Sequence, residues 1–172
     1  MSNQPVKKVI IVGGGTAGWM AAASVSKLIG KTVSVSVVES DEIGTVGVGE
    51  ATIPSMITLH KLLNIDERDF MTSVQGTFKL GISFENWKNV NENYVHSFGF
   101  TGKDCWAAGF QHFWLKGKQQ GLSSEFGDYC NELQAAKNNK FAVLPNNGMN
   151  YAFHMDAGLY AKYLRKIAEQ HG

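Results

Sequence analysis

Hydrophobic residues near the start of the chain follow the order of a strand, a helix and a second strand. Residues 8–12 are apolar after the first position, which is typical of a short strand buried on both faces of a parallel sheet. Residues 16–29 carry small and apolar side chains at helical spacing, and Gly30 follows as a helix stop. Residues 32–38 alternate valine with serine and predict a second strand. Together, residues 8–39 predict a βαβ unit of an α/β protein.

Downstream of this unit, the pattern predicts a mixture of helices and paired strands. Alternating apolar residues predict a strand over residues 78–87 that pairs with a strand over 94–100. The glycines and aromatic residues of 102–121 predict irregular structure. Apolar residues at helical spacing predict four further helices, which are residues 54–63 with Pro54 at the first helical position, a short helix capped by Asp66, residues 124–137, and residues 156–170 capped by Asp156.

The end of the chain bears on its completeness. The last predicted helix runs almost to Gly172, where a βα-alternating fold would continue with another strand. We therefore expect residues 1–172 to be the incomplete N-terminal portion of a longer protein.

Composition and charge narrow the class of protein. The chain has 172 residues with 44% hydrophobic residues, enough for one core, and 16 basic residues against 15 acidic ones. This balance predicts no nucleic acid and no anionic membrane as partner. The apolar stretch Val9 to Val12 is too short for a membrane span or a signal peptide, so we expect a cytoplasmic protein. Cys105 and Cys130 are expected to be reduced, mostly buried thiols, and the histidines show no metal-ligand spacing.

A glycine fingerprint lies between the first predicted strand and helix. Gly13, Gly15 and Gly18 have the G-x-G-x-x-G spacing of a dinucleotide-binding turn, and Glu39 follows 21 residues after Gly18. These glycines allow a tight turn, close approach of a pyrophosphate, and close packing of helix on strand. Glu39 would accept ribose hydroxyls and repel a 2′-phosphate, which favours FAD or NAD over NADP. The alternative is a glycine turn that binds no nucleotide.

A second glycine-rich segment follows the predicted ribose acid. Gly44, Gly47 and Gly49 precede Glu50 and make the segment too rich in glycine for a packed element. Such a backbone would suit the flat face of a large ring system. The alternative is a plain surface turn.

Several motifs in sequence order resemble the flavin-dependent tryptophan halogenase family, and together they cover essentially the whole chain. They are Gly13-Gly14-Gly15-Thr16-Ala17-Gly18-Trp19-Met20-Ala21-Ala22, Gly47-Val48-Gly49-Glu50-Ala51-Thr52-Ile53-Pro54-Ser55, Phe78-Lys79, Phe84-Glu85-Asn86-Trp87, His96-Ser97-Phe98-Gly99, Phe113-Trp114-Leu115 and Phe153-His154-Met155-Asp156-Ala157. The resemblance implies a Rossmann-like FAD-binding fold.

The resemblance also implies a chemistry. Members of the family take reduced FAD (FADH2) from a separate flavin reductase and use oxygen and a halide ion, chloride or bromide, to make hypohalous acid. A lysine then delivers the halogen to tryptophan or a related indole. Lys79 matches that lysine, and burial would lower the pKa of its amine. From the residues alone, Lys79 would otherwise be a solvated charge on an edge strand.

By the same matching, further residues of this chain correspond to the binding sites of the family. The ADP part of FAD corresponds to Gly13, Gly15, Thr16, Ala17, Gly18 and Glu39, and the flavin loop to Val46, Gly47, Gly49, Glu50 and Ala51. His96 and Phe98 correspond to the aromatic pair that stacks on the indole, although both residues are equally compatible with an ordinary core.

Other family features have no counterpart in this sequence. The Trp-x-Trp-x-Ile-Pro motif, the glutamate that positions the indole and the halide-binding segment are absent from residues 1–172. We therefore expect this piece alone to be inactive as a halogenase. The alternatives are an FAD-dependent monooxygenase or dehydrogenase on the same fold, or a non-catalytic flavin-binding remnant. The oligomeric state stays open, and a homodimer is compatible with the sequence.

Overall fold

The computed structural model describes residues 5–44, 49–143 and 148–172, and the chain divides into two compact units. The first unit comprises Met1–Thr77 and Phe153–Gly172, and the second comprises Phe78–Ala152. The chain passes from one unit to the other inside strand β4 (Thr77–Lys79) and inside strand β7 (Ala152–Asp156). Because both crossings lie within strands, the sequence contains no linker-like composition that would reveal them.

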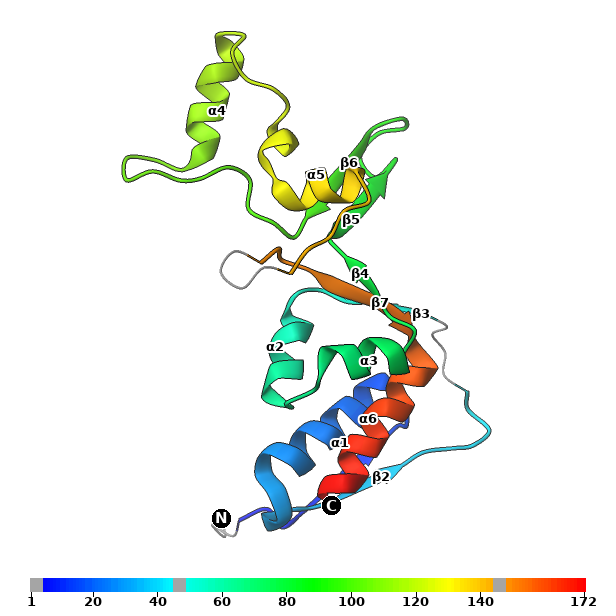
Figure 1. Ribbon diagram of the computed structural model, residues 1–172. Coiled ribbons are helices and arrows are strands. Elements are labelled where there is room, and N and C mark those ends of the chain that lie inside the picture. Colours follow the sequence, from blue (N-terminus) through cyan, green and yellow to red (C-terminus); the bar gives the residue numbers. More distant parts are fainter. Residues whose placement is uncertain (1–4, 45–48, 144–147) are drawn as a thin grey trace. The chain divides into compact units, whose positions relative to one another are not determined.

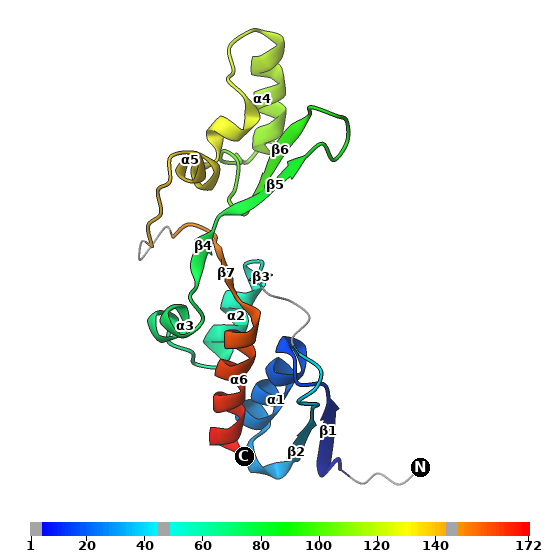
Figure 2. The same ribbon diagram turned by 90° about the vertical axis from the view of Figure 1, so that its right-hand side faces the viewer.

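The first unit begins with the predicted βαβ arrangement (Figures 1 and 2). Its elements are β1 (Lys8–Val12), α1 (Thr16–Ile29), a short 3-10 turn (Gly30–Thr32) and β2 (Ser34–Val38). Strands β1 and β2 are parallel, with Lys8 opposite Ser34 and Val12 opposite Val38. The predicted α/β fold class is therefore confirmed, and β2 begins two residues later than the sequence pattern predicted.

The predicted burial of β1 on both faces is wrong. Ile10 is 58% exposed and Val12 is 82% exposed, whereas Ala22 and Ala23 of α1 are almost completely buried. Among the described residues, β1 pairs only with β2, and α1 contacts both strands. The apolar side chains of β1 therefore lack a second covering layer in this part of the chain.

Helix α6 (Ala157–His171) packs along α1 in the first unit, and both ribbon views show the two helices side by side. Tyr160, Leu164 and Ala168 form its buried stripe, as the helical spacing predicted. The carboxylate of Asp156 accepts a hydrogen bond of 2.7 Å from the backbone N–H of Leu159, which confirms the predicted cap.

Helices α2 (Ser55–Leu62) and α3 (Glu67–Ser73) complete the helical part of the first unit. Pro54 is the N-cap of α2 and not its first helical residue, which moves the predicted start by one position. Asp66 caps α3 by accepting a 2.8 Å hydrogen bond from the N–H of Asp69, as predicted. A cluster of buried rings in this unit comes from α2, α3, β7 and α6, namely His60, Phe70, Phe153 and Tyr160.

Strands β3 (Gly49–Ala51) and β7 were not predicted. They pair antiparallel, with Gly49 opposite Asp156 and Ala51 opposite His154, in a sheet of order β3-β7-β4. The expectation that the second glycine-rich segment forms no packed element is therefore wrong from Gly49 onward. A three-residue strand has too little alternation to be recognised, and its partner lies about a hundred residues later in the sequence.

The second unit contains a hairpin and short helices. Strand β5 (Gly81–Glu85) pairs antiparallel with β6 (Asn93–Ser97), which confirms the predicted pairing. The predicted single strand over residues 78–87 is instead β4 followed by β5, separated by Leu80. The remaining elements are α4 (Phe110–Gln119), a 3-10 turn (Phe126–Tyr129) and α5 (Asn131–Lys137).

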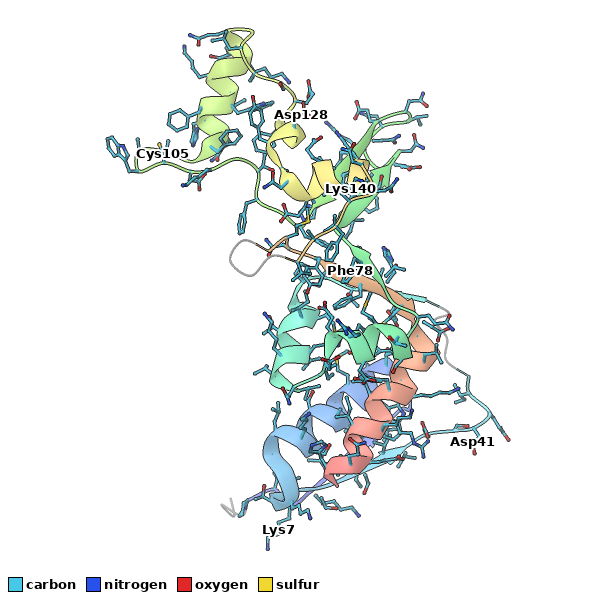
Figure 3. All side chains as sticks on the ribbon, in the orientation of Figure 1. Lys7, Asp41, Phe78, Cys105, Asp128 and Lys140 are labelled. Carbon is cyan, nitrogen blue, oxygen red and sulfur yellow. The ribbon has the colours of Figure 1, made fainter. Side chains whose placement is uncertain are left out.

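Two helix predictions in the second unit are wrong. Residues 110–119 are helical although the region 102–121 was expected to be irregular, and the N–H of Phe110 donates to the carboxylate of Asp104 at 2.7 Å. The expected helix over 124–137 is interrupted at Cys130, whose backbone is extended. Cys130 is buried, but Cys105 is an exposed free thiol, so the expectation of burial holds for only one of them (Figure 3).

None of the described helices has the length and apolar character that crossing a membrane requires. Within the same residues, no cluster of three or more histidine, cysteine, aspartate or glutamate side chains is arranged to hold a metal ion.

Candidate functional site

The glycine turn between β1 and α1 has a backbone that only glycine readily adopts. Gly13 has a φ of +124°, and its N–H donates to the carbonyl of Val38 at the end of β2, at 2.8 Å. A Cβ placed on Gly18 would lie 1.9 Å from the carbonyl oxygen of Gly13. Gly18 therefore allows the first turn of α1 to lie directly against the glycine turn.

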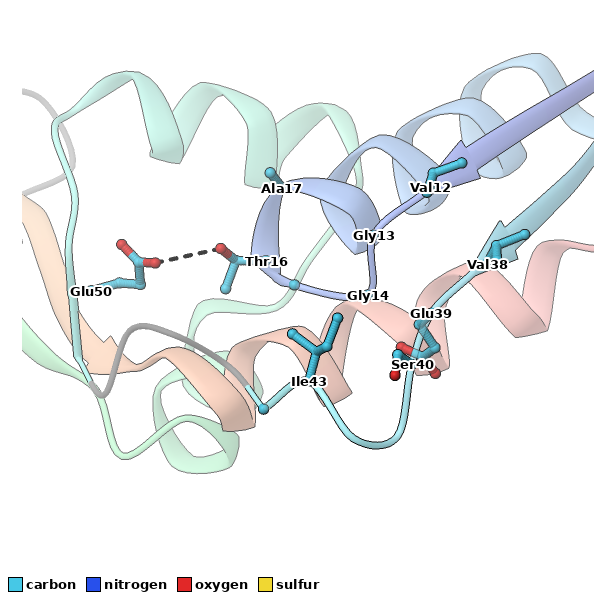
Figure 4. Close-up of a pocket in the computed structure, with 12 residues that line it drawn as sticks. Val12, Gly13, Gly14, Thr16, Ala17, Val38, Glu39, Ser40, Ile43 and Glu50 are labelled. Atoms are coloured by element: carbon cyan, nitrogen blue, oxygen red, sulfur yellow. Dashed lines mark hydrogen bonds between the residues drawn. The ribbon is translucent and has the colours of Figure 1, made fainter.

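A cavity of about 550 Å³ lies beside this turn in the first unit (Figure 4). Most of the residues matched to the ADP part of FAD line it, together with Glu50. Its lining consists of Val12, Gly13, Gly14, Gly15, Thr16, Ala17, Val38, Glu39, Ser40, Ile43, Gly44 and Glu50. Gly18 supports the turn from α1, Gly49 and Ala51 lie in β3 outside this lining, and Val46 and Gly47 lie outside the described residues.

The start of α1 is open to this cavity. Gly15 is the N-cap residue in an extended conformation, and no described side chain caps the helix. A Cβ on Gly15 would meet no atom of the described residues within 4 Å, so none of them fills the space beside its backbone. Unpaired N–H groups and the positive end of the helix dipole are suited to binding the phosphates of a nucleotide.

Glu50 faces Thr16 across the cavity (Figure 4). The Thr16 hydroxyl donates to the Glu50 carboxylate at 3.4 Å, which connects the start of α1 to β3. Glu50 also lines a second cavity of about 450 Å³ with apolar walls that include Met20, Met56 and Leu59. A carboxylate at this place favours a ligand group with N–H or O–H donors and disfavours a phosphate beside it.

Glu39 lies at the end of β2, as predicted, and already has protein partners. One carboxylate oxygen accepts a hydrogen bond of 3.1 Å from the Trp19 indole N–H. The other accepts a hydrogen bond of 2.8 Å from the Arg165 guanidinium. Neither partner was identified from the sequence. Trp19 follows the fingerprint directly and could have been considered, but Arg165 is 126 residues away and gives no local signal.

Lys79 is a buried lysine in the second unit. Its side chain is 8% exposed, and desolvation by burial lowers the pKa of its amine from the usual value of 10.5. The alternative reading of Lys79 as a solvated charge is therefore wrong. Its Nζ lies 5.4 Å from the centroid of the Phe98 ring, which brings two of the residues singled out in the sequence together.

His96 and Phe98 occupy different environments. His96 lies in β6 opposite Ile82 and is exposed, so it is not a core residue. Phe98 follows the end of β6, is half-buried, and its N–H donates to the carbonyl of Leu80 at 2.9 Å. The structure thus places Phe98, but not His96, in a described contact with Lys79.

Glu132 is a buried acid near the end of the hairpin that the sequence analysis did not single out. It is 7% exposed and accepts a 2.9 Å hydrogen bond from the backbone N–H of Asn150. A Cβ on Gly99 would lie 1.8 Å from its carboxylate, so Gly99 allows this acid to approach the segment that carries Phe98. The only signal in the sequence is the glycine directly after Phe98.

Comparison with known proteins decides the family. The sequence model of the tryptophan halogenase family matches residues 8–172. The chain belongs to this tryptophan halogenase family. The chain is 33% identical to tryptophan 7-halogenase RebH of Lentzea aerocolonigenes and 34% identical to 7-chloro-L-tryptophan 6-halogenase KtzR of a Kutzneria species. These matches cover 96% and 95% of the chain but 34% and 36% of the relatives.

Solved halogenase structures agree with the fold. Xcc4156, a flavin-dependent halogenase from Xanthomonas campestris, superposes with a TM-score of 0.94 at 62% identity, over 98% of this chain and 34% of that protein. BrvH, a flavin-dependent halogenase from Brevundimonas, superposes with a TM-score of 0.85 at 38% identity, over 97% of this chain and 34% of that protein. The chain thus spans about a third of the length of these halogenases.

Proposed function

We propose that this chain is the FAD-binding portion of a flavin-dependent halogenase that halogenates tryptophan or a related indole. The observation that carries the proposal is the buried Lys79 beside Phe98, in a member of the tryptophan halogenase family. Relatives that match the chain are halogenases of tryptophan and of chlorotryptophan, which supports an indole ring as substrate.

The described residues fit FAD. The cavity is bordered by bare glycine backbone, an uncapped helix start and a carboxylate at the end of β2, which are the groups that a diphosphate and a ribose require. Gly15, Thr16 and Ala17 offer backbone N–H groups to the pyrophosphate, and Glu39 accepts hydroxyls of the adenosine ribose. We assign Gly49, Glu50 and Ala51 to the flavin side of the cofactor, with Val46 and Gly47 of the same loop.

When bound in its reduced form, FAD would donate two electrons to oxygen, and oxygen supplies the oxidising equivalents that convert chloride or bromide into hypohalous acid. A separate flavin reductase supplies the reduced cofactor. In this chain, Lys79 then takes part in the chemistry. Its amine either donates a hydrogen bond to hypohalous acid or reacts with it. In the second case an N–halogen bond forms, the oxygen–halogen bond breaks, and the released hydroxide takes a proton from the nitrogen to leave water.

Burial of Lys79 favours the mode in which the amine reacts with hypohalous acid. Desolvation lowers the pKa of the amine, so a larger share of Lys79 is neutral at a given pH and has a lone pair for the halogen. Phe98, with His96 two residues earlier in β6, would hold a flat indole by stacking. An aromatic ring at this place excludes water and favours an electron-rich ring as acceptor of the halogen.

The test uses the full-length protein with reduced flavin, bromide and either tryptophan or indole. Lys79→Ala should abolish halogenated product while flavin oxidation continues, and Lys88→Ala, a change at an exposed lysine of the same unit, should leave product formation unchanged. Undiminished product from Lys79→Ala would contradict the role of Lys79. A hydroxylated product formed equally well without halide would instead favour a monooxygenase, and saturable flavin binding without any turnover would favour a non-catalytic flavin-binding protein.

A further inference from the structure

The Glu39 carboxylate is held between two helices of the first unit. The Trp19 indole N–H from α1 donates to Oε2 at 3.1 Å, and Nη1 of Arg165 from α6 donates to Oε1 at 2.8 Å. The guanidinium of Arg165 also lies 5.2 Å from the centroid of the Trp19 ring, so the three side chains contact one another. A second acid, Glu169, accepts a 2.7 Å hydrogen bond from Nε of Arg165 and fixes the other edge of the guanidinium.

The glycine turn leaves room for this arrangement. A Cβ placed on Gly14 would lie 1.9 Å from Oε2 of Glu39 and 2.5 Å from its Cβ. The Glu39 side chain therefore lies against the bare backbone of Gly14, which is an unconstrained position in the G-x-G-x-x-G spacing. The requirement for glycine at position 14 thus comes from Glu39 and is independent of the three fingerprint glycines.

Trp19 and Arg165 hold the Glu39 carboxylate in place but leave some of its hydrogen-bond acceptor positions open. An ionised carboxylate has about four acceptor positions, and Trp19 and Arg165 each use one, on different oxygens. The Arg165 cation also offsets the negative charge that Glu39 brings close to a diphosphate. An unrestrained glutamate would rotate between several rotamers, and fixing it on ligand binding would cost conformational entropy.

We infer that Arg165, together with Trp19, is a positioning residue that holds Glu39 ready to accept the hydroxyls of the adenosine ribose. The inference rests on the proposed binding of FAD in this cavity and extends it to a residue of α6. It assigns Arg165 a role in recognising the adenosine half of the cofactor, and no role toward the flavin ring. The contrary view is an exposed ion pair without effect on any ligand, because Arg165 is 49% exposed in its side chain.

The test compares ligands that carry or lack the adenosine ribose, on the full-length protein. Binding of FAD is measured by flavin fluorescence, and binding of ADP by its competition with FAD. Binding of FMN, the ligand that lacks adenosine, is measured in the same way as that of FAD. Arg165→Met keeps an apolar side chain over Trp19 but removes the charge and the donors. We expect this substitution to lower the affinity for FAD and for ADP about tenfold, which is the effect of one lost charge-assisted hydrogen bond. The affinity for FMN should stay unchanged.

Two controls separate positioning from a general loss of structure. Lys166→Met removes a neighbouring exposed charge of α6 and should leave all three affinities unchanged. In a Glu39→Gln background, Arg165→Met should have little further effect on FAD or ADP, because its action passes through the Glu39 carboxylate. Arg165→Lys, which keeps the charge but loses the planar fork, should fall between the wild type and Arg165→Met.

The outcomes are distinguishable. Wild-type affinity for FAD and ADP in Arg165→Met, an equal loss for FMN, or an undiminished effect of Arg165→Met in the Glu39→Gln background would each overturn the inference. Tighter FAD binding by Arg165→Met would also overturn the inference, because it would mean that Arg165 holds the Glu39 carboxylate away from the ribose. Failure of the wild-type protein to bind FAD saturably would instead contradict the proposed function itself.

Discussion

The ammonium group of Lys79 lies 5.4 Å from the centroid of the Phe98 ring, inside the second unit. Two influences on the amine therefore oppose each other. The electron-rich ring face favours the charged form, whereas burial favours the neutral form and dominates, so the pKa is lowered. Under the proposed function, this ring would hold an indole beside the amine that delivers the halogen.

Removing this ring should weaken substrate binding without touching the cofactor. Phe98→Leu keeps an apolar side chain but loses the flat face, so we expect the KM for tryptophan to rise about threefold to tenfold. The rate of flavin oxidation should not change. Phe100→Leu is the matched control, because Phe100 is an aromatic residue two positions later and is 83% exposed. Equal effects of the two substitutions, measured by steady-state product formation, would argue against a stacking role for Phe98.

Gly15 permits a test of charge at the start of α1. A Cβ at this position meets no atom within 4 Å in the part of the chain that the structure describes, so a longer side chain would extend into the cavity beside the helix N-terminus. Gly15→Glu places a negative charge where we expect the pyrophosphate and should weaken FAD binding about tenfold or more. Gly15→Gln adds similar bulk without charge and should weaken it less. If fluorescence titration gives wild-type affinity for Gly15→Glu, the phosphates bind elsewhere.

Gly18 should be required for folding and not for ligand contact. A Cβ there would lie 1.9 Å from the backbone oxygen of Gly13, and a backbone atom cannot move aside cheaply. We expect Gly18→Ala to lower the free energy of unfolding by about 1–3 kcal/mol, as overpacking does. Gly44→Ala is the control and should be close to wild type, because a Cβ there meets no described atom within 4 Å and Gly44 caps no described helix. Urea denaturation of the flavin-free protein measures both, and equal stability of the two variants would contradict the close packing described for Gly18.

The βαβ unit was predictable because its signals are local. The alternation of residues 34–38, the helical spacing of 16–29 and the glycines between them each act within a few residues. The caps Asp66 and Asp156 were predictable for the same reason, since each bonds an N–H three residues later. The candidate cavity followed, because the ends of β1 and β2 and the start of α1 must meet in such a unit.

The remaining features depend on contacts between residues that are distant in sequence. Strand β3 exists because Gly49 and Ala51 pair with β7, and three residues carry no recognisable period. Helix α4 was missed because the glycines and aromatic residues around it suggested irregular structure, although Phe110, Phe113 and Trp114 stand at helical spacing. Arg165 reaches Glu39 only because α6 packs along α1. No local pattern in the sequence carries the pairing of β3 with β7 or the contact between Arg165 and Glu39.

His60 should make the first unit less stable in acid. It is 5% exposed, its Nε2 lies 3.0 Å from the Tyr160 hydroxyl, and burial lowers its pKa from 6.5 to about 4. Between these two pH values the unfolded chain binds a proton that the folded chain does not, so the stabilisation is complete above pH 6.5 and is lost as the pH falls toward 4. The shift corresponds to a loss of about 3 kcal/mol.

The measurement is the free energy of unfolding in urea between pH 7 and pH 4, for the wild type and two variants. His60→Leu should remove most of the pH dependence in this range, because the titrating ring is gone while an apolar side chain remains among Phe70, Phe153 and Tyr160. His112→Leu, a change at an exposed histidine, should keep it. A histidine that stays neutral in the folded protein must make the protein less stable as the pH falls. An unchanged pH dependence in His60→Leu would therefore mean that His60 does not stay neutral and that other groups cause the acid sensitivity.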